Sequence, residues 1–165
     1  MRRYAYVGPD EIRQRVAGSD PGRAIRSAAD LVPVADGEAM TFVVDATGLL
    51  RVAHRRSEHV ACAGGGEVLS AGELTAVRDG RGDGVRITDI SNQSTGYCPE
   101  PESWPAVARA LDQAGVAHPG GFTYEATFRL CPGCGERNLV KDGWFECAMC
   151  GADLPAIWNF GSAAS

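Results

Sequence analysis

Four cysteines near the C-terminal end of the chain constrain its fold most strongly. They form two Cys-x-x-Cys pairs, Cys131-Pro132-Gly133-Cys134 and Cys147-Ala148-Met149-Cys150, which are twelve residues apart. Each pair is followed by a glycine, Gly135 or Gly151, whose positive φ angle lets backbone amides curl toward the sulfurs. Pairs at this separation place four thiolates around one metal ion, at the tips of two hairpins. The sequence therefore predicts a metal site whose ligands are Cys131, Cys134, Cys147 and Cys150.

These paired turns resemble the zinc-ribbon and rubredoxin-type knuckle family, in which C-P-x-C-G and C-x-x-C-G turns hold one metal ion. The resemblance covers residues 128–151 of the 165 and implies a metal site, not an activity. We expect a structural Zn²⁺, because four cysteines close the coordination shell, whereas a catalytic zinc keeps one position open for water. Iron in the same four-sulfur geometry and oxidation of the pairs to disulfides are the alternatives.

Length and hydropathy limit the class of protein. A chain of 165 residues suffices for one domain with a small metal-bound appendage. No apolar run approaches the roughly 20 residues that a membrane span requires. Polar residues follow Met1 almost at once, so no signal peptide is expected. We expect a cytoplasmic protein, in which Cys62 and Cys98 are free thiols at small buried positions.

The charge distribution bears on the partner. The formal net charge is −5, and four thiolates with one Zn²⁺ add about −2. Nucleic-acid modules normally carry a basic face, so a nucleic-acid partner is disfavoured. Residues 1–60 hold nine arginines against eight acidic residues, whereas residues 61–165 hold seven basic against thirteen acidic residues. Any anion-binding surface would therefore lie in the first part of the chain.

The apolar pattern predicts an α+β fold. Strands are expected over residues 3–7, 41–44, 49–53, 68–77, 85–90 and 122–130. Helices are expected over residues 9–18, 20–32 and 103–115. We predict a small antiparallel sheet or roll, covered by helices and ended by a zinc ribbon. Its parts are an N-terminal helical element, an α+β body, and the ribbon with an apolar tail that packs back on the body: residues 1–39, 40–127 and 128–165.

The most polar compact stretch, residues 54–59, follows a predicted strand. There His59 is a candidate general base with Glu58 or Glu73 as its partner, and Arg55 or Arg56 is a candidate clamp for an anionic substrate. Cys62 lies three residues after His59 and is a candidate nucleophile if its pKa is lowered. The alternative interpretation is a surface ion-pair cluster at a strand end.

Further along, Ala71-Gly72-Glu73 and the Asn92-to-Pro99 segment together resemble a small module of uncharacterised bacterial proteins. Some members are toxin-like and carry A-G-E followed by an S-G-H-Y-x-P loop. Here Thr95 intervenes and no histidine precedes Tyr97. The resemblance implies a ligand-binding or catalytic pocket that joins His59 and Glu73 to Asn92, Ser94 and Tyr97.

Three functions are open on the sequence alone. The first is a bacterial cytoplasmic module that uses its ribbon and tail to bind a protein partner or a small ligand. The second is a small enzyme or toxin-like effector that uses His59, Glu58 and Glu73 with Arg55 or Arg56. The third is a nucleic-acid-binding zinc ribbon.

Overall fold

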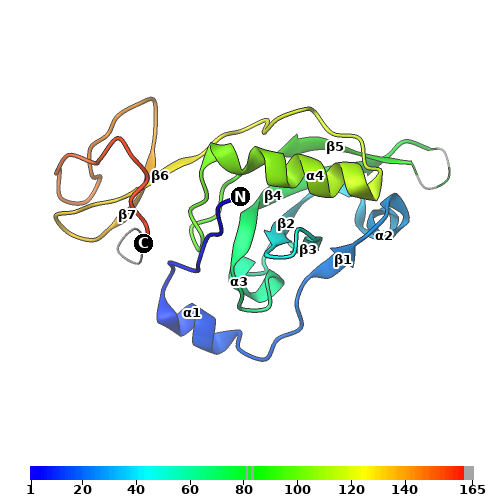
Figure 1. Ribbon diagram of the computed structural model, residues 1–165, viewed down its shortest axis with the longest axis horizontal. Coiled ribbons are helices and arrows are strands. Elements are labelled where there is room, and N and C mark those ends of the chain that lie inside the picture. The colour runs from blue at the N-terminus through cyan, green and yellow to red at the C-terminus, as the bar shows by residue number, and fades with distance from the viewer. Residues whose placement is uncertain (81, 83, 162–165) are drawn as a thin grey trace.

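The computed structural model describes residues 1–80, 82 and 84–161. Five strands form one antiparallel sheet in the order β1-β3-β2-β4-β5 (Figure 1). They are β1 (Arg23–Ile25), β2 (Asp36–Asp45), β3 (Leu50–His54), β4 (Val68–Arg78) and β5 (Val85–Ile90). A second sheet pairs β6 (Thr127–Leu130) with β7 (Arg137–Val140). The helices are α1 (Asp10–Arg15), α2 (Ala28–Leu31), α3 (His59–Cys62) and α4 (Trp104–Ala114), with short 3₁₀ turns η1 (Val32–Val34) and η2 (Pro101–Ser103). The predicted α+β class is confirmed.

Strand β2 lies at the centre of the sheet and is buried on both faces. Phe42 and Val44 face a core that includes Leu74, Val107 and Leu111. Val43 faces a second core, which includes Val60, Ala71, Val68 and Tyr97. A strand that is covered on both sides reads as a continuous apolar run, because both sets of alternating side chains must leave water. This is why residues 42–44 are all apolar.

Helix α4 covers the first core. Four of its five buried residues, Val107, Ala110, Leu111 and Ala114, recur at the three- and four-residue spacing of one helix face, and the fifth is Ala106. Gly115 ends the helix in the left-handed region at φ 73°, which a residue with a Cβ adopts at a cost. The predicted helix over residues 103–115 is confirmed.

Two sequence-based predictions of local structure are wrong. The expected helix over residues 20–32 is replaced by β1, in which Ala24 pairs with Arg51, and by the single turn of α2. Burial of Ile25 against the sheet outweighs the helix propensity of this alanine-rich stretch. Residues 3–7 contribute one bridge, Tyr4 to Val68, and no full strand. In addition, the strand expected over residues 122–130 begins only at Thr127.

We call residues 127–154 the cysteine module and residues 155–161 the tail. The module projects from one end of the body, and the tail returns toward the body (Figure 1). Trp158 donates from Nε1 to the carbonyl oxygen of Cys98 at 2.7 Å, and its ring meets that of Tyr4 edge-on at 5.5 Å. Phe160 is buried against Cys98, Ala126 and Phe128. The prediction that the aromatic tail packs on the body is confirmed for these two residues.

An ion pair also joins the module to the body. Arg129 of β6 donates from Nη1 to Glu100 Oε1 at 3.0 Å, and the two side chains are only 7% and 13% exposed. Three further donors of the guanidinium bind the carbonyl oxygens of Pro155, Ala156 and Phe128. One side chain thus holds β6, the tail and the loop before α4 together.

Among the described residues, no helix is both long enough and apolar enough to cross a membrane.

Candidate metal centre

The first Cys-x-x-Cys pair forms a tight turn directly after β6. The amide of Gly135 donates to the carbonyl oxygen of Cys131 at 2.9 Å, with Gly135 at φ 78°. Inside the turn, the amides of Gly133 and Cys134 point at the Cys131 sulfur, at 3.3 and 3.5 Å. The glycine after the pair therefore does what the sequence predicts.

The second pair repeats this arrangement. Gly151 donates to the carbonyl oxygen of Cys147 at 2.9 Å and has φ 78°, and the amide of Met149 points at the Cys147 sulfur at 3.4 Å. The two knuckles are therefore equivalent turns, and each supplies one buried and one exposed cysteine.

The four sulfurs converge on one point. Cys131 Sγ lies 3.5 Å from Cys150 Sγ, and Cys134 Sγ lies 3.6 Å from Cys147 Sγ. All four ligand atoms lie within 4.8 Å of one another. A regular tetrahedron with Zn–S bonds of about 2.3 Å has S–S edges of roughly 3.8 Å, so the spacing suits a metal ion. It does not suit the disulfide alternative, since an S–S bond measures about 2.05 Å and all six cysteines are free.

The knuckle amides divide the sulfurs into two types. Hydrogen bonding, led by the amide of Cys134, holds the pKa of Cys131 below its ordinary range, and the amide of Cys150 is the main cause that lowers the pKa of Cys147 to about 6. The amides of Glu136 and Ala152 act in the same direction on Cys134 and Cys150. Lost hydration and neighbouring sulfurs outweigh them, raising the pKa of Cys134 to about 12 and that of Cys150 above its usual value. A divalent cation would replace the protons that these sulfurs share.

Asn138 of β7 supports the cluster, and the sequence analysis missed it. Its side chain is buried and donates from Nδ2 to Cys147 Sγ at 3.4 Å and to the carbonyl oxygen of Glu136 at 3.1 Å. Its Oδ1 accepts from the amide of Ala148 at 3.0 Å. Asn138 therefore links the first knuckle to the second. The available signal was an amide side chain inside a short strand between the two cysteine pairs.

The predicted acid–base residues lie around α3. His59 Nε2 donates to the carbonyl oxygen of Gly72 at 2.8 Å, so the neutral ring keeps its lone pair on Nδ1. Glu58 is 3.5 Å from Arg15 in a partly exposed ion pair, and Glu73 is exposed. Arg55 and Arg56 are exposed on the turn after β3. The catalytic role of these five residues stays a prediction.

Burial lowers the pKa of His59, whereas its hydrogen bond with Gly72 and the charges of Glu73 and Glu58 act in the opposite direction. The partner Gly72 is itself constrained, because a Cβ there would lie 1.9 Å from the carbonyl oxygen of Ser91. His59 thus ties α3 to β4 where β4 passes closest to the loop that follows β5.

The predicted ligand-binding residues are buried and hydrogen-bonded to the backbone. Asn92 donates to the carbonyl oxygens of Pro99 and Ala126 and accepts from the amide of Ala126. Ser94 Oγ accepts from the amide of Tyr97, whose hydroxyl donates to the carbonyl oxygen of Gly66 at 2.7 Å. These bonds hold the loop over residues 91–99 to Ala126, just before β6, and to Gly66, between α3 and β4. A role in ligand binding stays a prediction.

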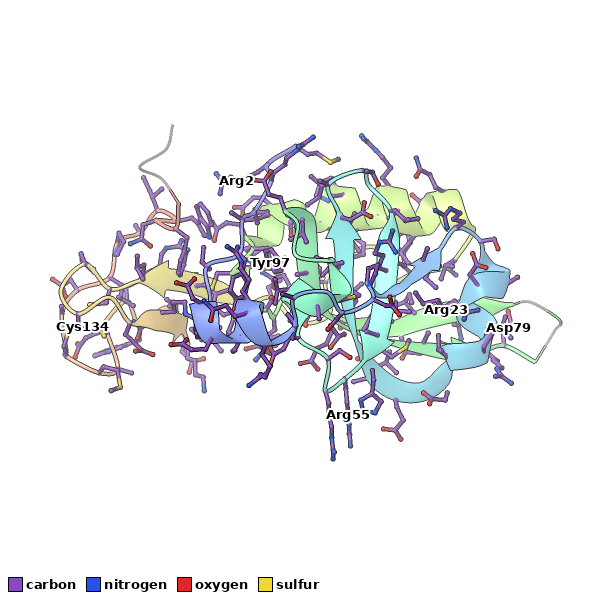
Figure 2. The ribbon with its side chains drawn as sticks, turned by 90° about the horizontal axis from the view of Figure 1, so that it is seen from below. Arg2, Arg23, Arg55, Asp79, Tyr97 and Cys134 are labelled. Atoms are coloured by element: carbon purple, nitrogen blue, oxygen red, sulfur yellow. The ribbon has the colours of Figure 1, made fainter. Side chains whose placement is uncertain are left out.

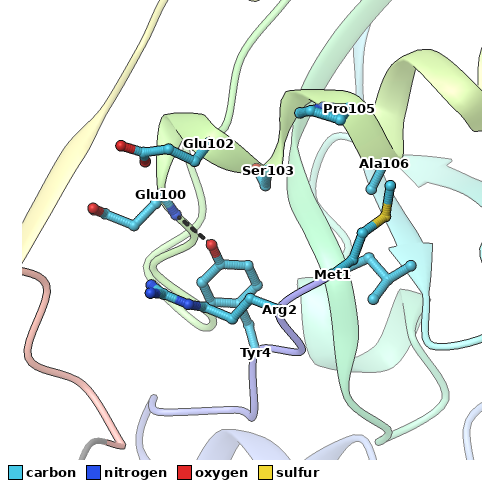
Figure 3. A pocket seen from close by; sticks show the side chains of 9 residues that line it. Met1, Arg2, Tyr4, Glu100, Glu102, Ser103, Pro105 and Ala106 are labelled. Carbon is cyan, nitrogen blue, oxygen red and sulfur yellow. Dashed lines mark hydrogen bonds between the residues drawn. The ribbon is translucent and has the colours of Figure 1, made fainter.

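A cavity of about 380 Å³ lies beside this loop (Figure 3). It is lined by the N-terminal residues, by Leu69, and by η2 and the start of α4, and its lining does not include Asn92, Ser94 or Tyr97. The Tyr4 hydroxyl accepts from the amide of Glu100 at 3.3 Å and keeps its own hydrogen available (Figure 3).

Cys62 and Cys98 lie outside the cluster. Burial raises the pKa of each thiol to about 12. This direction opposes the interpretation of Cys62 as a nucleophile, since a nucleophilic cysteine needs a lowered pKa.

No protein-family model, curated protein or solved structure matches this chain.

His59 makes stability depend on pH. Because burial lowers its pKa below the ordinary value of about 6.5, the unfolded chain takes up the proton first, and stability falls as the pH drops through this value. We expect His59→Gln, which keeps the donor to Gly72 and does not titrate, to flatten the fall in melting temperature between pH 7.5 and 6. The exposed His54→Gln serves as the control. Equal slopes for wild type and His59→Gln would contradict the assignment.

Proposed function

We propose that this chain is a zinc protein in which Cys131, Cys134, Cys147 and Cys150 hold one structural Zn²⁺ in a zinc-ribbon module. The convergence of the four sulfurs within 4.8 Å carries the proposal. Four thiolates fill the coordination shell and leave no position for a substrate or water, so the ion supports the fold and takes no part in a reaction. We propose zinc rather than iron, although the four-sulfur geometry itself suits either ion.

A structural ion would also stabilise the cysteine module, which buries few apolar side chains around the sulfurs. In the apolar cluster around the sulfurs, Leu154 is the one described residue that is buried besides Cys131 and Cys147. Val140, Phe145 and Ala152 pack against this cluster and are partly buried. A segment of this size cannot repay its conformational entropy by such limited burial, and metal coordination supplies the missing free energy.

We propose further that the module and tail form a surface that binds a protein partner. Large apolar side chains are exposed here, although such groups are usually buried: Trp144 is 67%, Met149 72% and Ile157 79% exposed. Exposed apolar groups on a rigid support are typical of protein interfaces. Acidic residues outnumber basic ones around them, with Glu136, Asp142, Glu146 and Asp153 against Arg137 and Lys141, so a neutral or basic protein fits better than a nucleic acid.

The metal assignment predicts the result of elemental analysis. Purified protein should contain one zinc per chain, and Cys147→Ser should lose both the zinc and several degrees of melting temperature, because three thiolates no longer close the shell. Met149→Ser, in the same knuckle but not a ligand, should keep both. A zinc-free protein with an unchanged melting temperature would contradict the proposal. A red protein that contains iron would change the assignment of the metal from zinc to iron.

Asn138→Leu should weaken zinc binding without removing a ligand. The substitution deletes the donor to Cys147 and the acceptor for Ala148. Groups that orient metal ligands in this way typically contribute about 10- to 100-fold in metal affinity. Competition with a chromophoric chelator measures the change, and Lys141→Ala, an exposed substitution in the same module, serves as the control. An affinity equal to that of wild type would show that Asn138 is dispensable.

The interface predicts a variant that folds but does not bind. Trp144→Ser with Met149→Ser should keep zinc content and melting temperature, since both side chains are exposed. In a quantitative pull-down, the double variant should recover at least about tenfold less partner than wild type, because aromatic anchors dominate interface energies. Tyr124→Ser, which removes an exposed aromatic outside the module, is the control. Equal recovery by wild type and double variant would place the interface elsewhere.

A further inference from the structure

A groove of about 570 Å³ opens on the body at the end of β3. Its apolar lining includes Pro33 and Val34 of η1, which are at least partly exposed, and Met40 and Val52, which are buried. Met40 and Val52 also belong to the first core. The volume lies within the roughly 300–1,000 Å³ of sites that hold drug-sized ligands. Two residues of its lining, Arg23 and Arg55, are labelled in Figure 2. They lie on the body, away from Cys134 of the cysteine module.

Basic side chains from β1 and from the end of β3 line the groove: Arg23, His54 and Arg55. Arg23 donates from Nε to the carbonyl oxygen of Asp30 at 2.7 Å, which fixes the guanidinium and leaves both terminal nitrogens without a partner in the described part of the chain. His54 Nδ1 accepts from the amide of Arg56 at 3.1 Å, so the neutral ring carries its hydrogen on Nε2. Two of the three donors are thus oriented before any ligand arrives.

Acidic side chains line the same groove from the start of β2. Asp36 Oδ1 accepts from the amide of Glu38 at 2.9 Å, which holds the Asp36 carboxylate in place. The Glu38 side chain is exposed. Within residues 1–80, 82 and 84–161, no ion pair joins either carboxylate to Arg23, His54 or Arg55. The groove therefore presents charges of both signs that do not neutralise each other.

We propose that this groove binds a short peptide with free ends and apolar side chains. The carboxylate of the peptide pairs with Arg23 and Arg55, and its ammonium group pairs with Asp36 and Glu38. Its apolar side chains pack against Pro33 and Val34, beside Met40. Charge complementarity selects this ligand. A purely anionic ligand meets the two carboxylates, and a purely cationic one meets the two guanidinium groups, at a cost in either case. The site is independent of the zinc proposal, because no cysteine contributes to it.

The methionines provide the readout. The chain has three, of which Met40 lies in the groove, Met149 on the cysteine module and Met1 at the N-terminus. With ¹³C-methyl methionine, titration of the zinc-loaded protein with Leu-Leu-Leu should shift the Met40 methyl signal and leave that of Met149 unchanged. N-acetyl-Leu-Leu-Leu and Leu-Leu-Leu-amide each lack one end charge and should bind about two- to fivefold more weakly, the effect of one exposed ion pair.

Substitutions test the two charged sets separately. Arg23→Gln and Glu38→Gln should each weaken Leu-Leu-Leu by about two- to fivefold. Arg56→Gln, which removes an exposed arginine outside the groove lining, should bind as wild type. If Arg23→Gln has a lower melting temperature than wild type, Arg55→Gln takes its place in the binding measurement. A Met40 signal that does not move at 10 mM peptide, equal binding of all three peptides, or a shift at Met149 in place of Met40 overturns the proposal.

Discussion

Burial of the central strands on both faces is the constraint on which the rest of the structure depends. β2 and β4 place one set of side chains under α4 and the other under α3, the N-terminal segment and the loop over residues 91–99. Such a sheet tolerates little bulk where a loop crosses it closely. Gly72 is the clearest case, because the Ser91 carbonyl occupies the space of its missing Cβ, and the Gly72 carbonyl in turn accepts from His59. His59, a catalytic candidate in the sequence, thus contributes to this close crossing.

The cysteine module follows a different principle. Its interior consists of sulfurs and few apolar side chains, and it joins the body through polar contacts as much as through packing. Arg129 is the centre of this connection. A buried arginine is costly unless it is paired and hydrogen-bonded, and here the guanidinium binds the Glu100 carboxylate and three carbonyl oxygens. The Asn92 side chain hydrogen-bonds to both the amide and the carbonyl oxygen of Ala126, and it thereby fixes the chain just before β6. The module is therefore held in a definite orientation by directional bonds.

The two regions to which we assign binding lie at separate places. The cysteine module exposes Trp144 and Met149 in an acidic setting, whereas the groove is built from β1, β2 and β3 (Figures 1 and 2). The groove uses residues from the more basic first part of the chain, where the charge distribution would place any anion-binding surface. Arg55, predicted from the sequence to hold an anionic group, lines the groove, while Arg56 does not. The adjacent acidic residues change the preferred ligand from an anion to a molecule with both charges.

The sequence by itself determined the features that depend on neighbouring residues. The cysteine knuckles, the helix ending at Gly115 and the strands around Phe42 and Val85 all follow from spacing, turn residues and apolar periodicity, which act within a few residues. Only the tertiary structure decided features that join distant segments. Ile25 enters a strand because β3 offers it a partner and a buried face, and Asn138 supports a sulfur nine residues away because the second knuckle folds against β7. His59, Asn92 and Tyr97 bind backbone groups of remote segments, and the groove brings Arg23 together with Glu38 and Arg55. Contacts of this kind depend on how the chain closes on itself, and a single sequence carries no local signal for them.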